Sequence, residues 1–505
     1  MKAKILSLLI TLAVSASLVA CAGGSGSADS DSSANAAAED ESDVKDNDSE
    51  GNGNGEVKTV TMWIPALYDM PLASEVQDAM NSVSEEKYGI HYELTFVNWG
   101  NYEQQINLAL TDDELDIFTP GSFFDYYKNG QLADITEYYE AAPDDVKSAW
   151  GERYINTMWV DGALYGVPHI ADYGHYVSLN LDQEVADQYG ITQDQELTME
   201  EADELLAKIH EDFPDRYTLG AGGGTYLFAN GFYTWDPMDD TVGVLADRGQ
   251  STVVESVFDN EDFIFLAAKA QEWYEAGYVM PDILSNTQAW ATMIANNQIA
   301  AVFDTYGVNY VDGVVRTRIS EVGCWTPSAS FGASSWCISA NSKDPETAFK
   351  ALALLFSDSE LATCLNNGIE GKNYTKNEDG TISYINGTDA GSSGYGAPSV
   401  YWKYPGAQLS QPLDVNGADF FERLEAFNDE CLFSKAVGFY FDREPVIDEM
   451  SACQAVIDKY YTTLLSGAVD VESTLEQARA EMEAAGEEKV IAEKQKQLDE
   501  FLANQ

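Results

Sequence analysis

Hydrophobic and polar residues alternate with two different periods along the first part of the chain. A period of two, rich in β-branched residues, is typical of strands, and a period near 3.6 is typical of amphipathic helices. Strands that alternate with helices predict βαβ units and a largely parallel sheet. The strands are predicted at 57–65, 90–98 and 115–120, and the helices at 72–89 and 101–114.

Aromatic and small residues stand where these strands are predicted to end. The first strand is expected to run into a loop at Trp63 and Pro65, the second ends before Trp99, and Gly121 and Ser122 follow the third. Ligands bind beyond the carboxyl ends of the strands in open sheets of this kind. These residues are therefore the first candidates for a binding site.

The later part of the chain repeats the same two patterns. The extended segments 162–182 and 334–344 are rich in β-forming residues, and we expect the first to pass from one lobe of the protein to another. An apolar strand at 299–303 is predicted to end in an exposed loop of Asp304, Thr305 and Tyr306. Further helices are predicted near 199–211, 261–276, 345–365 and 472–505, with Asp344 as the cap of the third and Gly486 dividing the last in two.

The amino terminus has the order of a secretory signal. Lys2 and Lys4 precede an apolar run that ends at Ala20 and is too short to span a bilayer comfortably, so residues 1–20 are interpreted as a signal peptide. The sequence LVAC before and at Cys21 resembles the lipobox of bacterial lipoproteins, whose cysteine receives a diacylglycerol before cleavage. An ordinary signal peptide cut near an A-x-A site is the alternative.

The segment that follows the cysteine is predicted to be a disordered acidic tether. Residues 22–57 are almost entirely Gly, Ser, Ala, Asn, Asp and Glu, and they cannot bury enough apolar surface to order themselves. A flexible chain of this length reaches roughly 33 Å. Residues 21–57 would therefore hold the protein close to a membrane surface without embedding it.

The net charge of the chain argues against some classes of binding partner. The chain has 27 basic and 85 acidic residues and a formal net charge of −58, which argues against nucleic acid and anionic lipid because both would be repelled. The length beyond the tether indicates two or more domains.

Cysteine and histidine patterns predict neither a metal site nor a cofactor. The histidines form no H-x-x-x-H pair, and no Cys/His cluster has zinc spacing. The acidic loop 376–384 is a weak alternative for calcium, because it is not an EF-hand. Five cysteines are interpreted as buried small hydrophobic residues, with one disulfide among them left open: Cys324, Cys337, Cys364, Cys431 and Cys453.

Several stretches together resemble a known family. Their order and spacing are similar to those of the extracellular solute-binding lipoproteins of ABC importers, in the long oligosaccharide-binding branch found in Gram-positive bacteria. The resemblance covers nearly all of residues 58–505. It rests on LDIFTPGSFFDYYKNGQLADIT, DGALYGVPH, EWYEAGYVMPDIL, PETAFKALALLFSDSELATCLNNGIEGKNY and the terminal AAGEEKVIAEKQKQLDEFL.

This resemblance implies a fold and a division of the chain. The family fold is a type II, periplasmic-binding-protein-like α/β fold, in which two lobes with parallel-rich sheets and flanking helices are joined by a hinge. Carried onto this sequence, the first lobe holds 58–172 plus 337–395, and the second holds 173–336 plus 396–505 with the carboxyl-terminal helices.

The resemblance also implies a function. The protein would be a lipid-anchored monomer on the extracellular face of the cell membrane, and it would capture a carbohydrate between its lobes and deliver it to the permease subunits of an ABC transporter. No bond would be made or broken. A glycoside hydrolase, which needs two carboxylates at a suitable separation, and a surface carbohydrate sensor or adhesin remain as alternatives.

A sugar presents an apolar face and a rim of hydroxyl groups, so its binder needs aromatic platforms and hydrogen-bonding side chains. Core packing is the alternative for each aromatic candidate, and Trp150 and Trp273 are assigned to the core because they lie on helical patterns. The aromatic candidates are Trp63, Trp99, Phe123, Tyr173, Tyr176, Trp235, Tyr306, Trp336 and Trp402. The polar candidates are Asn98, Ser122, His175, Asp304 and Glu370, with a turn-forming role as the alternative for Glu370.

Overall fold

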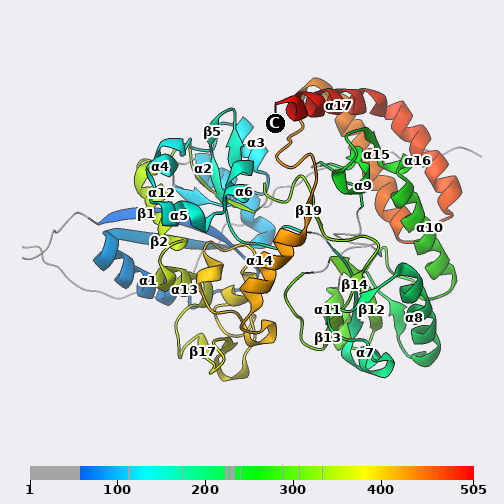
Figure 1. The fold of residues 1–505 in the computed structure, drawn as a ribbon, viewed down its shortest axis with the longest axis horizontal. Coiled ribbons are helices and arrows are strands. Elements are labelled where there is room, and N and C mark those ends of the chain that lie inside the picture. The colour runs from blue at the N-terminus through cyan, green and yellow to red at the C-terminus, as the bar shows by residue number, and fades with distance from the viewer. Residues whose placement is uncertain are drawn as a thin grey trace, which may run out of the picture. The chain divides into compact units, whose positions relative to one another are not determined.

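The computed structural model follows the alternation of strands and helices that the sequence predicts (Figure 1). It describes residues 57–111, 114–174, 176–221, 227, 234–238, 240–286, 288–305, 307–332 and 334–504.

The first sheet combines parallel and antiparallel pairs. β1 runs parallel to β2 and to β3, as the βαβ pattern predicts, whereas β16 is antiparallel to both β3 and β6. β16 therefore returns from a distant part of the sequence to extend a sheet begun near the amino terminus. In the described residues the strand order is β2 (Ile90–Asn98), β1 (Lys58–Ala66), β3 (Ile117–Phe118), β16 (Ser335–Ile338) and β6 (Gly166–Pro168).

The helices around this sheet begin and end at the residues that favour their ends. Gly89 closes α1 in the left-handed conformation, and the Asp344 carboxylate accepts a 3.1 Å hydrogen bond from Thr347 N at the start of α12, so both predicted helix ends are confirmed. The helices are α1 (Ala73–Tyr88), α2 (Tyr102–Thr111), α3 (Phe123–Lys128), α4 (Thr136–Ala141), α5 (Asp144–Ala149), α6 (Glu152–Ile155), α12 (Pro345–Leu355) and α13 (Ser359–Asn367).

The predicted loop at Trp63 and Pro65 is wrong, because β1 continues to Ala66. Proline lacks an N–H group and is tolerated where a strand has a free edge. In the described part of the chain β3 pairs with β1 at Met62, so β1 extends past that neighbour before Pro65 is reached.

The second sheet is mostly antiparallel, so the prediction of parallel-rich sheets is wrong for this sheet. β7 is antiparallel to both β12 and β13, and β12 is parallel to β9. The strand order is β13 (Val314–Arg316), β7 (Val177–Asp182), β12 (Ile299–Thr305) and β9 (Tyr217–Leu219). The expected loop at Asp304 and Thr305 is corrected here, because both residues pair with β7 as part of β12. Tyr306 lies outside the described residues.

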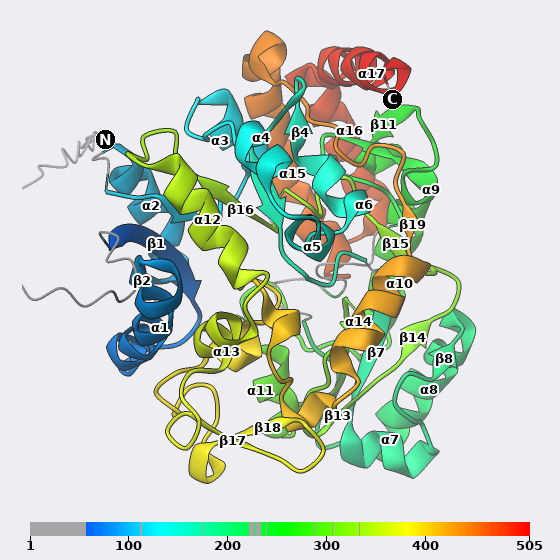
Figure 2. The same cartoon turned by 60° about the vertical axis from the view of Figure 1, so that its left-hand side comes forward.

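Helices α15, α16 and α17 lie beside one another in both views, in orange to red (Figures 1 and 2). Gly486 has a left-handed conformation between α16 and α17, so the predicted division of the tail is confirmed. The helices of the second part are α7 (Gln183–Tyr189), α8 (Met199–Asp212), α9 (Ala246–Gly249), α10 (Glu261–Glu275), α11 (Trp290–Ala295), α14 (Phe420–Glu430), α15 (Ile447–Leu465), α16 (Val471–Ala485) and α17 (Glu487–Ala503).

Short strand pairs complete the described secondary structure. They are β4 (Trp159–Val160) with β5 (Ala163–Leu164), β8 (Glu196–Leu197) with β14 (Arg318–Ile319), β10 (Gly243–Leu245) with β11 (Val254–Ser256), β15 (Trp325–Thr326) with β19 (Leu432–Phe433), and β17 (Tyr374–Lys376) with β18 (Ile382–Tyr384).

Two large hydrophobic cores form around the two sheets. The first core contains buried residues between Val60 and Tyr173 and between Phe331 and Tyr404. The second core contains buried residues between Val177 and Val322 and between Ala436 and Leu498. Trp150 belongs to the first core and Trp273 to the second, so both core assignments are confirmed.

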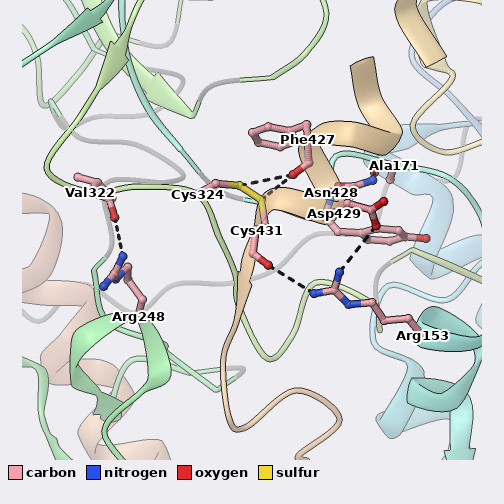
Figure 3. Close-up of a disulfide and its surroundings, with 10 residues drawn as sticks. Arg153, Ala171, Arg248, Val322, Cys324, Phe427, Asn428, Asp429 and Cys431 are labelled. Atoms are coloured by element: carbon pink, nitrogen blue, oxygen red, sulfur yellow. Dashed lines mark hydrogen bonds and ion pairs between the residues drawn. A yellow bond between two sulfur atoms is a disulfide. The ribbon is translucent and has the colours of Figure 1, made fainter. Parts of the chain in front are cut away.

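The chain passes from one core to the other along three segments. We name them the first crossing, residues 169–174 and 176, the second crossing, residues 320–332 and 334, and the third crossing, residues 427–435. A disulfide joins Cys324 of the second crossing to Cys431 of the third (Figure 3). A Cβ at Gly174 of the first crossing would collide with both sulfur atoms. The three crossings are therefore packed against one another at the disulfide.

This bond answers the question that the sequence left open about the cysteines. Within the described residues Cys337, Cys364 and Cys453 are free thiols; Cys337 and Cys453 are buried as predicted, whereas Cys364 is only partly buried, so the prediction is wrong for that residue. In the same part of the chain, no helix is long and apolar enough to cross a membrane.

A buried ion pair holds the last helix to the second core. Lys494 of α17 is 0% exposed, and its ammonium group donates hydrogen bonds to Gly243 O at 2.7 Å, Asp240 Oδ1 at 3.0 Å and Pro237 O at 3.2 Å. These partners compensate the ammonium for the water it loses on burial. Docking of α17 therefore depends on a single lysine more than on the exposed charges of the helix.

We expect Lys494→Met to lower the free energy of unfolding by about 3–5 kcal/mol, because it leaves the buried Asp240 carboxylate with only the more distant Arg443, at 3.8 Å, as a cationic partner. Lys494→Met combined with Asp240→Leu should recover most of the loss. The control is Lys496→Met on the exposed side of the same helix, which should change stability by less than about 0.5 kcal/mol. Denaturant unfolding followed by circular dichroism measures all three, and equal effects of the two lysine variants would contradict the prediction.

Candidate functional site

Two tryptophans meet at the carboxyl end of β2. Trp99 begins a short 3₁₀ helix directly after the strand and is 42% exposed. Its ring lies 5.5 Å from the ring of Trp402 in an edge-on arrangement. An exposed, edge-braced indole offers a flat apolar face that is held in one orientation.

The backbone carbonyl groups of Trp402 and Lys403 are held by two buried rings. His169 Nε2 donates to Trp402 O at 2.6 Å, and Trp336 Nε1 donates to Lys403 O at 3.1 Å. Burial, with the positive charge of Lys403 beside it, lowers the pKa of His169 to about 3, so the ring is neutral. A neutral imidazole that faces a carbonyl must carry its proton on Nε2. The orientation of Trp402 thus depends on the first crossing.

Lys403 brings a positive charge to the tryptophan pair. Its ammonium lies 5.8 Å from the centre of the Trp99 ring. Burial lowers the pKa of Lys403 to about 8, and the nearby Glu103 opposes this effect. Glu103, in the first turn of α2, also accepts a 2.7 Å hydrogen bond from Tyr126 Oη. A Cβ at Gly121 would collide with the Glu103 carboxylate, so the glycine leaves room for it.

Tyr401, the residue before Trp402, contacts a network of acidic and basic side chains. The Tyr401 hydroxyl donates to Asp172 Oδ2 at 2.8 Å. Burial raises the pKa of Asp172, while the hydrogen bond from Tyr401 and the charge of Arg316 oppose the rise. The Arg316 guanidinium donates to three carbonyl oxygens, those of Thr305, Gly307 and Asn309, at 3.2, 3.2 and 2.9 Å.

Asp304 lies beside this network near the end of β12. Its Oδ1 accepts a 2.8 Å hydrogen bond from Thr305 N. Burial raises the pKa of Asp304 to about 6, and Arg316, Thr305 N–H and the Trp290 side chain oppose the rise. A carboxylate that is largely buried but incompletely compensated is ready to accept hydrogen bonds from a ligand.

These residues are linked through three consecutive positions of the chain, and we name them the central cluster. Tyr401, Trp402 and Lys403 are consecutive, and they connect the aromatic pair to the acidic and basic network. Aromatic faces, carboxylates and cations together can bind a molecule that has both an apolar face and many hydroxyl groups. The central cluster consists of Trp99, Glu103, Asp172, Asp304, Arg316, Tyr401, Trp402 and Lys403.

A hollow of about 480 Å³ lies next to Gly121, and we name it the α3 hollow. Its wall includes Ser122 and Phe123 from the first core and Asp240, Phe439 and Gln454 from the second. Gly121 borders both the hollow and the Glu103 carboxylate, so the α3 hollow adjoins the central cluster.

Helix α3 also contacts the segment that precedes the carboxyl-terminal helices. The Tyr440 ring stacks on Phe124 at 4.7 Å, and the Tyr440 hydroxyl donates to Asp125 Oδ1 at 3.0 Å. Lys128 forms an ion pair with Asp442. These contacts join the first core to the second at the edge of the α3 hollow.

The structure brings some of the predicted site residues together and disperses others. Trp99, Trp402 and Asp304 belong to the central cluster, and Ser122 and Phe123 line the α3 hollow, although Phe123 is almost fully buried. Trp63 is partly buried within β1. His175 and Tyr306 lie outside the described residues.

Other candidates are packed into the cores. Trp235 is buried against Phe263 in the second core, and Trp336 is 0% exposed within β16. Tyr173 is buried against Phe331, and Tyr176 is buried beside α14. Ligand contact by these four residues stays a prediction, and their burial favours a packing role.

The remaining polar candidates have local partners. Asn98 caps the short helix after β2 by accepting from Gly100 N at 3.1 Å, and Glu370 forms a 2.9 Å ion pair with Lys376. Within the described residues, no group of three or more His, Cys, Asp or Glu side chains could hold a metal ion.

Sequence reasoning missed five members of the central cluster. Glu103, Asp172, Arg316, Tyr401 and Lys403 carry no motif of their own. Three of them are next to predicted candidates, because Asp172 precedes Tyr173, and Tyr401 and Lys403 flank Trp402. The signal in the sequence that could have identified Asp172 and Lys403 is a charged residue next to a candidate aromatic residue.

Comparison with known proteins gives relatives that match most of the chain. A carbohydrate ABC transporter substrate-binding protein of Streptococcus pneumoniae serotype 4 is 25% identical over 444 residues, which cover 84% of this chain and 87% of that protein. The crystal structure of the N-glycan transport solute-binding protein NgtS from Streptococcus pneumoniae matches with a TM-score of 0.78 at 23% identity, covering 88% of this chain and 99% of that one. The Streptococcus pneumoniae ABC-transporter substrate-binding protein FusA, in complex with kestose, matches with a TM-score of 0.58 at 15% identity, covering 89% and 100%.

These likenesses confirm the predicted fold class, a two-lobed α/β fold of the type II solute-binding proteins. A protein-family model described as a domain of unknown function matches residues 435–503. The model described as bacterial extracellular solute-binding protein matches residues 72–361, more than half of the chain. The chain therefore belongs to the family of bacterial extracellular solute-binding proteins.

Proposed function

We propose that this protein is the substrate-binding component of a carbohydrate ABC transporter, and that it captures an oligosaccharide and delivers it to the permease subunits. The observation that carries the proposal is the central cluster, in which the exposed indole of Trp99 is braced by Trp402 and lies 5.8 Å from the ammonium of the buried Lys403. The names of its relatives, which concern carbohydrate and N-glycan transport, support the same class of ligand.

The two cores correspond in this proposal to the two lobes. The first lobe extends to Tyr404, because Tyr395, Ala397 and Val400 pack in the first core. The three crossings form the hinge, and the ligand lies against the central cluster and the α3 hollow. Trp99 and Trp402 stack on a sugar ring, while Asp304 accepts hydrogen bonds from its hydroxyl groups.

The proposal includes a lipid anchor. Cys21 receives a diacylglycerol, and the acidic tether keeps the lobes near the outer surface of the cell membrane. Cys21 and the tether up to residue 56 lie outside the described residues, so this part of the proposal rests on the lipobox alone.

We expect Trp99→Ala to weaken oligosaccharide binding by roughly 30-fold or more, since truncation of an aromatic hot spot typically removes about 2 kcal/mol. The melting temperature of the unliganded protein should hardly change, because the side chain is 42% exposed. The control is Phe265→Ala, which truncates an exposed aromatic residue on α10. Calorimetry with N-glycan fragments and fructo-oligosaccharides measures the affinities. Unchanged affinity in Trp99→Ala, or hydrolysis of the oligosaccharides with ordinary turnover, would refute the assignment.

The raised pKa of Asp304 predicts two effects of pH, which have opposite signs. One is on the stability of the empty protein and the other is on its affinity for the ligand. The folded-state pKa of about 6 lies above the ordinary value of 3.8, so the ionised carboxylate destabilises the empty protein at neutral pH; this destabilisation begins to be relieved as the pH falls through about 6 and is fully relieved only below the ordinary pKa of 3.8. Between pH 7 and 5 the parent should gain about 1 kcal/mol of stability relative to Asp304→Asn. Ligand affinity should fall by up to roughly tenfold over the same range, because about a tenth of the carboxyl remains ionised at pH 5.

Calorimetry and thermal unfolding at both pH values separate the two effects. Asp304→Asn should bind ligand with little dependence on pH. A stability effect without an affinity effect would show that Asp304 has a structural role and does not contact the ligand.

Cys21→Ala should release the protein into the medium or leave it as uncleaved precursor, because the two acyl chains of one diacylglycerol give firm retention. Ligand affinity and fold should stay the same. Cell fractionation with immunoblotting makes the measurement, and Cys364→Ala is the matched control for loss of a thiol. Full retention of Cys21→Ala at the cell surface would rule out the anchor.

A further inference from the structure

A second cavity lies on the first crossing, away from the residues that line the α3 hollow. It has a volume of about 360 Å³, and we name it the crossing pocket. Its walls come from the turn between α5 and α6, from residues 168–173 of the chain and from α14. A volume near 360 Å³ is at the lower end of the range for small-molecule pockets, roughly 300–1,000 Å³.

Three residues that line the pocket each carry a fully buried polar atom that has no hydrogen-bond partner among the described residues. These atoms are Trp150 Nε1, His169 Nδ1 and Gln408 Oε1. Trp150 is 3% exposed and His169 is 1% exposed. Buried polar atoms are usually hydrogen-bonded, so three such atoms on residues that line one cavity point to a missing partner.

The chemistry of the three atoms specifies that partner. His169 Nε2 donates to Trp402 O, so the other ring nitrogen of the neutral imidazole is an acceptor. Gln408 Oε1 is a second acceptor, and the indole N–H of Trp150 is a donor. A hydroxyl group both donates and accepts, and a molecule with several hydroxyl groups could satisfy all three atoms.

The remaining walls suit the same kind of molecule. The rings of Tyr154, Tyr173 and Phe421 line the pocket, and the exposed Glu422 and Glu425 border it. Aromatic rings pack against the C–H face of a sugar, and carboxylates accept hydrogen bonds from its hydroxyl groups. An anionic ligand is disfavoured because the two carboxylates would repel it.

We propose that the crossing pocket is a second binding site, separate from the central cluster, for a neutral, hydroxyl-rich molecule of about the size of one hexose. The site does not depend on the proposed transport function, since its lining residues are not members of the central cluster. It is nevertheless connected to that cluster, because His169 contributes one ring nitrogen to the pocket and holds the Trp402 backbone with the other.

The test is ligand-observed NMR and calorimetry on the whole protein with four probes, D-glucose, D-mannose, N-acetyl-D-glucosamine and myo-inositol. We expect at least one probe to bind with millimolar or better affinity. Binding should persist in Trp99→Ala and Trp402→Ala, which impair the central cluster. It should fall at least tenfold in Gln408→Leu, which removes one acceptor at nearly constant volume.

A pair of variants at the pocket rim controls for indirect effects. Ser148 is exposed and lines the pocket, so Ser148→Trp should fill the pocket without disturbing the core, and Ser148→Ala should leave probe binding unchanged. Oligosaccharide binding at the central cluster should survive in Ser148→Trp, so failure of this proposal can be told from failure of the transport proposal. The proposal is overturned if none of the probes binds, if probe binding disappears in Trp402→Ala, or if it is unaffected by Ser148→Trp.

Discussion

The packing of three chain segments around the Cys324–Cys431 disulfide is the constraint on which the rest of the binding region depends. The bond closes a loop across 107 residues, which in the chain-entropy model restricts the unfolded state by about 4–5 kcal/mol. Gly174 lies against the sulfur atoms, so the first crossing must approach the bond without a side chain. Asn428 of the third crossing accepts from Tyr173 N and donates to Ala171 O, which fixes the first crossing on both sides of Asp172.

The central cluster follows directly from that packing. Asp172 belongs to the first crossing, and its partner Tyr401 lies 229 residues away in sequence. With the first crossing held by Asn428 and Gly174, the Tyr401 hydroxyl and the Arg316 guanidinium have a fixed carboxylate to contact. His169 on the same crossing then sets the position of Trp402, and Trp402 braces Trp99. The aromatic and the charged halves of the cluster therefore share one support.

Electrostatics in the cluster differ from those of the whole chain. The chain has a formal net charge of −58, but Arg316 and Lys403 lie beside the carboxyl groups of Glu103, Asp172 and Asp304. Because the cluster has positive and negative groups in similar numbers, it binds a ligand through hydrogen bonds and not through a net charge. An anionic ligand would meet the repulsion of the whole chain, while a neutral hydroxyl-rich ligand would meet donors and acceptors together.

The sequence predicted most helices and strands correctly, but it did not predict which distant segments of the chain contact one another. Strands and helices carry local signals, as at the Asp344 cap and at Gly486, and Trp99 was identified because it follows a strand. Trp336 and Trp235 were candidates as well, but an aromatic residue near a predicted loop or crossing has the same local sequence whether it is exposed or packed in a core. Asp172 with Tyr401, and Cys324 with Cys431, are contacts between distant segments, and no period or motif in one segment identifies its partner in another.

The carboxyl-terminal region is part of the binding architecture, and its contacts show why it cannot be regarded as an appended module. Lys494 is buried against Asp240, and Asp240 is itself in the wall of the α3 hollow. Phe439 and Gln454 line the same hollow, while Tyr440 stacks on Phe124 of α3. Removing the region would expose the buried carboxylate of Asp240 and open one wall of the hollow. The residues after 435 therefore stabilise the second core through the Lys494–Asp240 pair and, through Phe439, Tyr440 and Gln454, shape the surface that faces α3.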